Sequence, residues 1–233
     1  MEEIMDENPF KKQRRINRTR MMQHYIEMQF DEIEDFSEFI KSAIAREKTI
    51  TARRIEKEAL RLDEKFREEY YEIFSEDYQK IGDIFEKLAM ESLIIILFSI
   101  IEGGMVTLCN SIRHDKNINK HLKIKSCRQE GYLEKTKNYL QKDLGVDLLL
   151  GSNQEWREII GLQAIRNAVA HNKGWLNTKN STLRKHYKNG LIEIRHQEED
   201  VKRELSGRVR VKSEYVDHIL PQIRKFFHNI KVS

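Results

Sequence analysis

Proline is almost absent from this chain, and no other feature restricts its fold as strongly. The two prolines stand at positions 9 and 221, so the long stretch between them lacks the residue that interrupts helices most effectively. With only ten glycines and 34% charged residues, the composition favours a helical protein with few turns. A length of 233 residues can bury a proper core, and it permits one large domain or two small ones.

The N-terminal third has the apolar spacing of amphipathic helices. From Tyr25 onward, apolar residues recur in steps of three and four, at Ile26, Phe30, Ile33, Phe36, Ile40 and Ile44. A second helix is expected over residues 51–71, which are highly charged and have few apolar anchors. We expect four aromatic side chains to pack this arm onto the rest of the protein: Tyr70, Tyr71, Phe74 and Tyr78. Residues 1–20 are expected to form a charged, mobile segment, which is either a solubilising tail, the favoured interpretation, or an arm that binds nucleic acid.

The remaining two thirds predict further helices and one pair of strands. A central helix is expected over residues 84–112, and Gly103-Gly104 within it predicts a kink or a close approach to another helix. Residues 132–144 are again periodic, and Gly145 follows them as a helix cap. The other expected elements are a helix that begins near Ser152 or Asn153, strands over 191–195 and 208–211, and a final helix over 213–230 with Pro221 as a kink.

Several features indicate a cytoplasmic protein. The apolar run over residues 92–101 has half the length that a membrane span needs, so we expect a helix that is buried on all sides. The N-terminus is acidic, unlike a secretory signal. The cysteines Cys109 and Cys127 offer neither a disulfide framework nor the spacing of metal ligands. We therefore expect no membrane partner, no cofactor and no bound metal.

Charge is distributed unevenly along the chain. Residues 1–100 hold 17 Lys and Arg against 23 Asp and Glu, whereas residues 101–233 hold 25 against 15. A basic half of this kind attracts polyanions such as RNA. A solvated, lysine-rich helical surface explains the same charge, so the imbalance alone leaves both interpretations open.

Three polar residues stand close together at the end of an apolar helical segment. Arg166, Asn167 and His171 occur within six residues, and this is the only Arg-x-x-x-x-His in the chain. Histidine can transfer protons near neutral pH, arginine can hold a phosphate, and an amide can orient either group. Asn167 and His171 share a helix face, whereas Arg166 is about 140° from His171 and needs its long side chain to reach. These residue types can cut RNA without a metal.

The motif resembles the RNxxxH form of the signature of HEPN (higher eukaryotes and prokaryotes nucleotide-binding) domains. The resemblance continues upstream in residues 97–102 and 108–110, in residues 156–159 that lead into the motif, and in Gly174 that closes it. It covers residues 84–230 and implies a helical bundle. We therefore expect an all-α fold with a HEPN-type bundle over residues 81–233, a helical extension over residues 1–80, and a short β-hairpin near the C-terminus.

RNA supplies its own nucleophile, the 2′-hydroxyl, so a metal-free ribonuclease needs a base, an acid and a positive group. His171 suits the base or the acid, Arg166 suits the phosphate, and Asn167 can fix either. One histidine cannot easily be both acid and base in a single step. The resemblance implies a homodimer whose two motifs meet, a 2′,3′-cyclic phosphate product, and a bacterial setting in phage defence or beside an antitoxin or regulatory protein.

Other residues are candidates for supporting roles. Basic side chains near the motif are candidate RNA contacts: Lys173, Arg184, Lys185 and Lys188, of which the last three are expected in a loop. Asn172 and the carboxylate Glu102, which is costly to bury without a partner, are candidate supports for the Arg166 site. The remaining histidines are scattered and are expected at the surface rather than as metal ligands.

The sequence favours a metal-independent endoribonuclease, and two rival functions stay open. The first is a non-catalytic HEPN module that binds RNA or a nucleotide. The second is a structural helical protein that binds a partner, in which Arg166 pairs with a carboxylate and the asparagines satisfy the end of the helix.

Overall fold

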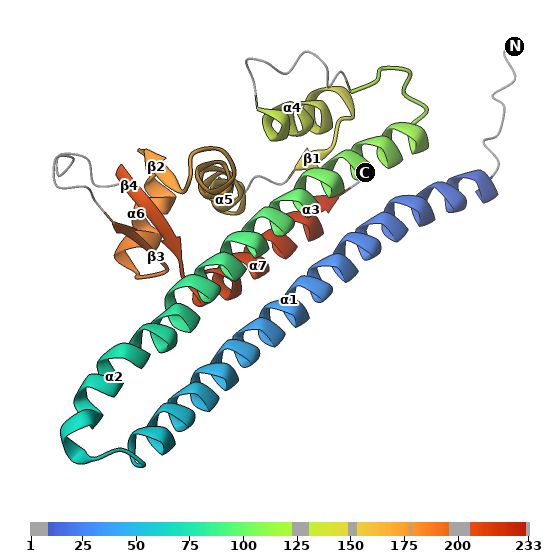
Figure 1. Cartoon of the computed structure of the whole chain (residues 1–233). Coiled ribbons are helices and arrows are strands. Elements are labelled where there is room, and N and C mark those ends of the chain that lie inside the picture. Colours follow the sequence, from blue (N-terminus) through green and yellow to red (C-terminus); the bar gives the residue numbers. More distant parts are fainter. Residues whose placement is uncertain (1–8, 123–130, 149–152, 178, 196–205, 232–233) are drawn as a thin grey trace, which may run out of the picture. The chain divides into compact units, whose positions relative to one another are not determined.

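The computed structural model describes residues 9–122, 131–148, 153–177, 179–195 and 206–231. These residues are mostly helical, with a small antiparallel sheet near the C-terminus, which confirms the expected helical fold class (Figure 1). Ser152, an expected helix cap, and Cys127 lie outside the described residues. The side chains of residues 1–17, most of the expected N-terminal tail, also lie outside them.

The chain divides into two compact units that are interleaved along the sequence. Unit 1 combines Met1–Asp31, Leu97–Ile159 and Pro221–Ser233, and unit 2 combines Glu32–Ile96 with Ile160–Leu220. Each unit is therefore assembled from segments that are far apart in sequence. The division of the chain at residue 80 into an extension and a HEPN domain stays a prediction.

The first helix is longer than the sequence predicts. Helix α1 runs from Pro9 to Ala59 without the expected break after Ile44, and it already occupies residues that were expected to form a tail. The chain turns at residues 60–63, and helix α2 (Glu64–Gln79) returns beside α1 in unit 2 (Figure 1). The interval between Ile44 and Thr51 contains neither Gly nor Pro, so nothing in it stops a helix.

The aromatic residues of α2 pack less than expected. Tyr70 and Phe74 contact each other at a ring-centroid distance of 4.4 Å, and the Tyr70 hydroxyl donates to Glu58 at 2.6 Å. This hydrogen bond raises the pKa of Tyr70. Tyr71 and Tyr78 remain exposed. The expectation that all four rings attach the arm to the protein is therefore wrong for two of them.

Helix α2 continues through a π-helical segment, η1 (Lys80–Phe85), into helix α3 (Glu86–Asp115). Gly103 and Gly104 do not interrupt α3. The run over residues 92–101 is not buried on all sides, because Ile95 and Ile96 are exposed. The helical stretch Glu64–Asp115 is long and apolar enough to cross a membrane by length and composition, but core helices of soluble proteins pass the same test. The cytoplasmic location stays a prediction.

Unit 1 shows why a glycine stands in the middle of α3. A Cβ at Gly104 would lie 3.2 Å from Phe227 and 3.3 Å from Ile26, so the glycine permits the close approach that the sequence suggested. The Thr19 hydroxyl donates to the buried Asp115 at 2.9 Å, which ties α1 to α3 within this unit. Gly145, with φ of +59°, follows the last helical turn as expected.

Several shorter elements complete unit 1. Helix α4 (Tyr132–Asn138) passes into the π-helical segment η3 (Tyr139–Asp143), as the periodicity over residues 132–144 predicts. Strand β1 (Asp147–Leu148) pairs antiparallel with strand β5 (Ile230–Lys231), a pairing that the sequence did not suggest. Arg224, on helix α7 (Ser213–His228), forms ion pairs with Glu27 and Asp31 of α1.

Unit 2 contains a three-stranded antiparallel sheet in the order β2-β4-β3. Strands β3 (Ile192–Arg195) and β4 (Ser206–Val211) are the expected pair. Strand β2 (Trp175–Asn177) was not expected and pairs with the other side of β4. Figure 1 shows this sheet beside helix α6 (Ser181–Lys188). Side chains alternate between a buried face and a polar face, as in sheets with one solvated side.

Gly207 is the position in the sheet that least tolerates a side chain. Its φ is +155°, and a Cβ there would lie 2.6 Å from the carbonyl oxygen of Arg195 and 2.8 Å from Ile194 Cγ2. We expect Gly207→Ala to push β4 away from β3 and to destabilise the protein by about 2 kcal/mol or more.

Thermal unfolding measures this effect, with Gly103→Ala as the matched control. A Cβ at Gly103 meets no atom within 4 Å, so alanine there is expected to stabilise the helix by up to about 1 kcal/mol. A Gly207→Ala protein that unfolds at the wild-type temperature would contradict the described strand contact.

Candidate functional site

The Arg166–His171 motif occupies the last turns of helix α5 (Asn153–His171). Within unit 2, Leu162, Ile165 and Ala168 are buried, at the three-residue spacing of a helix face that packs into a core. Arg166 and Asn167 are half-buried beside this face, and His171 is exposed at the helix end. The apolar residues of α5 thus hold the motif in place and leave its polar groups accessible.

The three polar side chains meet as the sequence predicts. Arg166 Nη1 donates to Asn167 Oδ1 at 2.9 Å and lies 3.3 Å from His171 Nε2. The long guanidinium side chain therefore spans the angle of about 140° that separates it from His171 around the helix. One guanidinium, one amide and one imidazole form a single cluster, called the Arg166 cluster below.

The contact between Arg166 and His171 involves the Nε2 atom of the imidazole. A guanidinium carries only hydrogen-bond donors, so a hydrogen bond between the two requires an unprotonated Nε2 on His171. The Nε2 atom thus lies next to the positive charge that could hold a phosphate.

A tight turn after His171 exposes the end of the cluster. Lys173 and Gly174 have φ of +52° and +82°, and the Gly174 amide donates to the Ala168 carbonyl at 2.8 Å. Two successive residues of left-handed conformation and a hydrogen bond that spans six residues thus close the helix. His171, Asn172 and Lys173 are all exposed. Asn172 also accepts the backbone amide of Trp175 through its carbonyl at 2.8 Å, a structural role that coexists with the expected support of the site.

Glu102, the predicted supporting carboxylate, is less buried than expected. Glu102 lies on α3 in unit 1, whereas Arg166 belongs to unit 2, and each unit is described by itself. Glu102 is partly exposed rather than fully buried, because it stands on the edge of the buried stripe that Ile101 and Met105 form. Its support of Arg166 stays a prediction.

The predicted RNA-binding residues after the motif lie on a helix rather than in a loop. Asn180 caps α6 by accepting the amides of Thr182 and Leu183 at 2.9 and 3.2 Å. The cap and a buried apolar face make a short helix favourable in a segment rich in charge. Three basic side chains of this segment are exposed, as an RNA contact requires: Arg184, Lys185 and Lys188.

One histidine expected at the surface is buried. His186, 1% exposed, packs its ring edge-on against the rings of Tyr215 and His218 at centroid distances of 5.4 and 5.0 Å. It is buried because it follows Leu183 by three residues on the inner face of α6. The ligand nitrogens of His186 and His218 lie within 4.8 Å of each other, so the pair could provide two ligands to a transition metal. Glu158 offers a further buried carboxylate on α5 in unit 1.

The described cysteine is not a reactive thiol. Cys109 is buried in unit 1, and burial raises the pKa of its thiol to about 12. The reactive form of cysteine is the thiolate, which this environment disfavours.

A polar face of the sheet holds candidate functional residues that the sequence did not single out. Trp175, Arg195 and Arg208 lie on β2, β3 and β4, and Arg195 and Arg208 are exposed. The alternation Arg208-Val209-Arg210-Val211 was visible as a strand, but the partner strand β2 is only three residues long. Because β2 was not expected, nothing in the sequence placed Trp175 beside Arg208.

No protein family model, no curated protein and no solved structure matches the chain.

Proposed function

We propose that this protein is a metal-independent endoribonuclease and that Arg166, Asn167 and His171 are its catalytic residues. The observation that carries the proposal is the Arg166 cluster itself, in which a guanidinium contacts both an amide oxygen and an imidazole nitrogen at an exposed helix end. A positive group beside a proton acceptor is what cleavage by the RNA 2′-hydroxyl requires.

Each residue of the Arg166 cluster has one role in the proposed reaction. His171 Nε2 removes the proton of the 2′-hydroxyl, whose oxygen then attacks the adjacent phosphorus. Arg166 donates to the oxygens of the phosphorane and stabilises their charge. Asn167 holds the guanidinium in position through its Oδ1 atom. Departure of the 5′ oxygen with a proton leaves a 2′,3′-cyclic phosphate and a 5′-hydroxyl.

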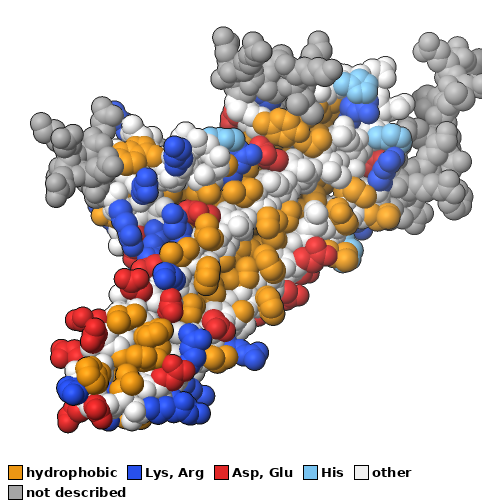
Figure 2. Space-filling view, viewed as in Figure 1, with side chains coloured by type: hydrophobic (Ala, Val, Ile, Leu, Met, Phe, Trp, Pro, Cys, Tyr) orange, Lys and Arg blue, Asp and Glu red, His pale blue; other side chains and the backbone are white. Residues whose placement is uncertain are grey.

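The proton for the leaving oxygen comes from a second copy of His171, so the proposed enzyme is a homodimer. An exposed apolar surface on unit 2 supports this assembly. Five large apolar side chains along one side of η1 and α3 are between 36% and 57% exposed: Ile84, Phe85, Leu88, Ile95 and Ile96. Monomeric proteins rarely leave a contiguous apolar stripe of this kind in water. Figure 2 shows hydrophobic side chains in a band flanked by charged ones.

The HEPN assignment belongs to the same proposal. The RNxxxH pattern, the mostly helical fold and the position of the motif at the end of a core helix support a HEPN-type bundle. With that assignment we propose a cytoplasmic effector of phage defence or a toxin paired with an antitoxin or another regulatory protein.

A non-catalytic RNA-binding module is the second candidate function. The exposed basic side chains of α6, Arg184, Lys185 and Lys188, favour it, because they can neutralise phosphates whether or not the Arg166 cluster reacts. A structural protein that uses the exposed apolar stripe to bind another protein is the third candidate.

Incubation of the purified protein with total tRNA and with a structured RNA in EDTA tests the proposal. The proposal predicts cleavage that EDTA does not reduce, since no step needs a metal. Salt-sensitive binding of intact RNA would favour the second candidate. Absence of both cleavage and binding by a folded, dimeric protein would favour the third.

A further inference from the structure

The polar face of the sheet in unit 2 begins where the motif helix ends. Trp175, the first residue of β2, donates its amide to the carbonyl of Asn172, and the Gly174 carbonyl accepts the amide of Val209 on β4 at 2.9 Å. The sheet is thus joined by hydrogen bonds to the turn that follows His171.

The strand register aligns three side chains across the sheet. Trp175 of β2 is opposite Arg208 of β4, and Arg208 is opposite Arg195 of β3. Directly opposite residues of antiparallel strands point to the same face, and neighbouring strands are about 4.8 Å apart. An indole ring and two guanidinium groups therefore form one row, called the Trp175 row below.

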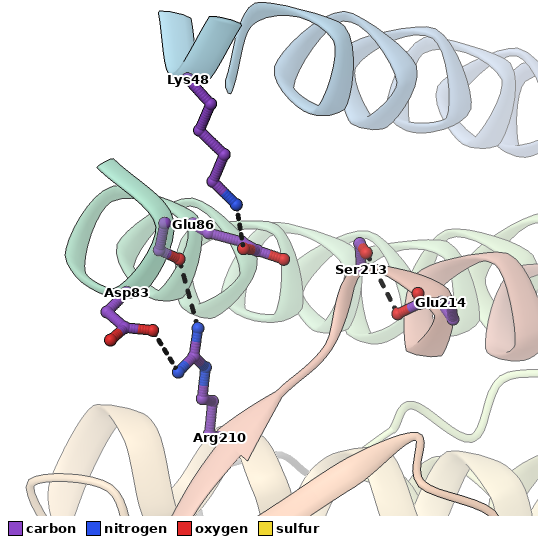
Figure 3. A network of polar contacts seen from close by, with 7 residues as sticks. Lys48, Asp83, Glu86, Arg210, Ser213 and Glu214 are labelled. Atoms are coloured by element: carbon purple, nitrogen blue, oxygen red, sulfur yellow. Dashed lines mark hydrogen bonds and ion pairs between the residues drawn. The ribbon is translucent and has the colours of Figure 1, made fainter. Parts of the chain in front are cut away.

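The next row of the same face has its charges neutralised. Arg210 donates to the Asp83 carboxylate at 2.7 Å and to the Gly82 carbonyl at 3.2 Å (Figure 3). The hydrogen bond from Arg210 to the carboxylate lowers the pKa of Asp83. Glu193, opposite Arg210, forms an ion pair with Lys212 at 2.7 Å. The positive charges of Arg210 and Lys212 are therefore both paired with carboxylates.

The Trp175 row differs from it. Among the residues that the structure describes, neither Arg195 nor Arg208 forms an ion pair with a carboxylate, and both are exposed. Trp175 is half-buried, so part of this residue is accessible to solvent. Figure 2 shows Lys and Arg side chains gathered over the region of this sheet.

We propose that the Trp175 row is a binding site for single-stranded RNA, which it delivers to the Arg166 cluster; this substrate assignment rests on the proposed ribonuclease function. One unpaired base stacks on Trp175, and the guanidinium groups of Arg195 and Arg208 contact the phosphates beside it. An indole can stack only on a base that is not already stacked within a duplex, so the row selects single strands over double-stranded RNA.

A binding assay with RNA that cannot be cleaved separates this proposal from the catalytic one. A fluorescent single-stranded oligonucleotide with 2′-O-methyl groups lacks the nucleophile, so its anisotropy reports binding alone. The test variants are Trp175→Ala and the double variant Arg195→Gln/Arg208→Gln. The matched control is Arg46→Gln/Arg53→Gln, which removes two exposed arginines of α1 in the same unit.

We expect Trp175→Ala to weaken single-strand binding about tenfold or more, and Trp175→Phe to recover most of it. The double arginine variant is expected to weaken binding and to reduce the slope of log K against log salt by about 1.4, the value for two single-strand phosphates. The control is expected to bind as wild type does. Circular dichroism checks that every variant is folded.

Two results would overturn the proposal. One is unchanged single-strand affinity in both test variants, and the other is an equal loss of affinity for single strands and for a 2′-O-methyl duplex. Loss of single-strand binding by the test variants in a protein that cuts no RNA would contradict the ribonuclease function but would leave the Trp175 row as a binding site.

Discussion

Replacing His171 with alanine is expected to lower the rate of RNA cleavage in EDTA by about a thousandfold or more, without loss of the fold. The side chain is exposed at the last residue of α5, so its removal leaves no cavity in the core. It also removes the proposed acceptor of the 2′-hydroxyl proton, and in the proposed dimer both the base and the acid are lost together. General acid–base groups contribute about 100-fold to 10,000-fold each.

The chain offers a closely matched control for this variant. Arg113 Nη1 lies 3.3 Å from His121 Nε2, the same separation as between Arg166 and His171, and His121 is also exposed. His121→Ala should therefore cut RNA at the wild-type rate. If His171→Ala kept full activity while His121→Ala lost it, the active site would be assigned to the wrong arginine–histidine pair.

The second large effect is expected at Arg166. Arg166→Lys should reduce kcat by about a hundredfold or more, because the guanidinium contacts Asn167 and His171 and, as we propose, the phosphate as well. A lysine offers only one compact charge in its place. The loss should fall mainly on kcat, since the phosphorane carries more charge than the bound substrate.

Single-turnover and steady-state kinetics on the same RNA measure this loss, and Arg46→Lys on α1 is the control. An Arg166→Lys enzyme with normal kcat and a raised KM would mean that Arg166 only binds the substrate. Such a result would move transition-state stabilisation to another residue.

The helices were predictable where apolar spacing was regular, and their ends were predictable only where a special residue marks them. Gly145 and Gly174 follow helices with positive φ, as the sequence indicated. The turn between α1 and α2 was placed too early, because residues 60–63 contain neither glycine nor proline and so carry no turn signal. Helix α6 was missed because its fold depends on one cap, Asn180, and one buried face.

The Arg166 cluster was predictable because it lies within two turns of one helix. Helical geometry fixes how its three residues are separated, and the reach of an arginine side chain covers the remainder. The Trp175 row could not be predicted in the same way. Its three residues come from three strands, and their alignment depends on a register that only the folded sheet defines.

Burial was hardest to predict for groups with mixed character. His186 is buried in a segment that is otherwise basic, because only the face that it shares with Leu183 packs inward. Conversely, Ile95 and Ile96 are exposed in the most apolar segment of the chain. A sequence shows which side chains are apolar, but it does not show which of them remain exposed on the folded chain.

Analysis of the RNA ends left by the wild-type protein and by His171→Ala in EDTA tests the central claim most directly. The account predicts 2′,3′-cyclic phosphate and 5′-hydroxyl ends from the wild type, and intact RNA from the variant. Ends with a 5′-phosphate, or equal cleavage by both proteins, would contradict a metal-independent site built on Arg166, Asn167 and His171.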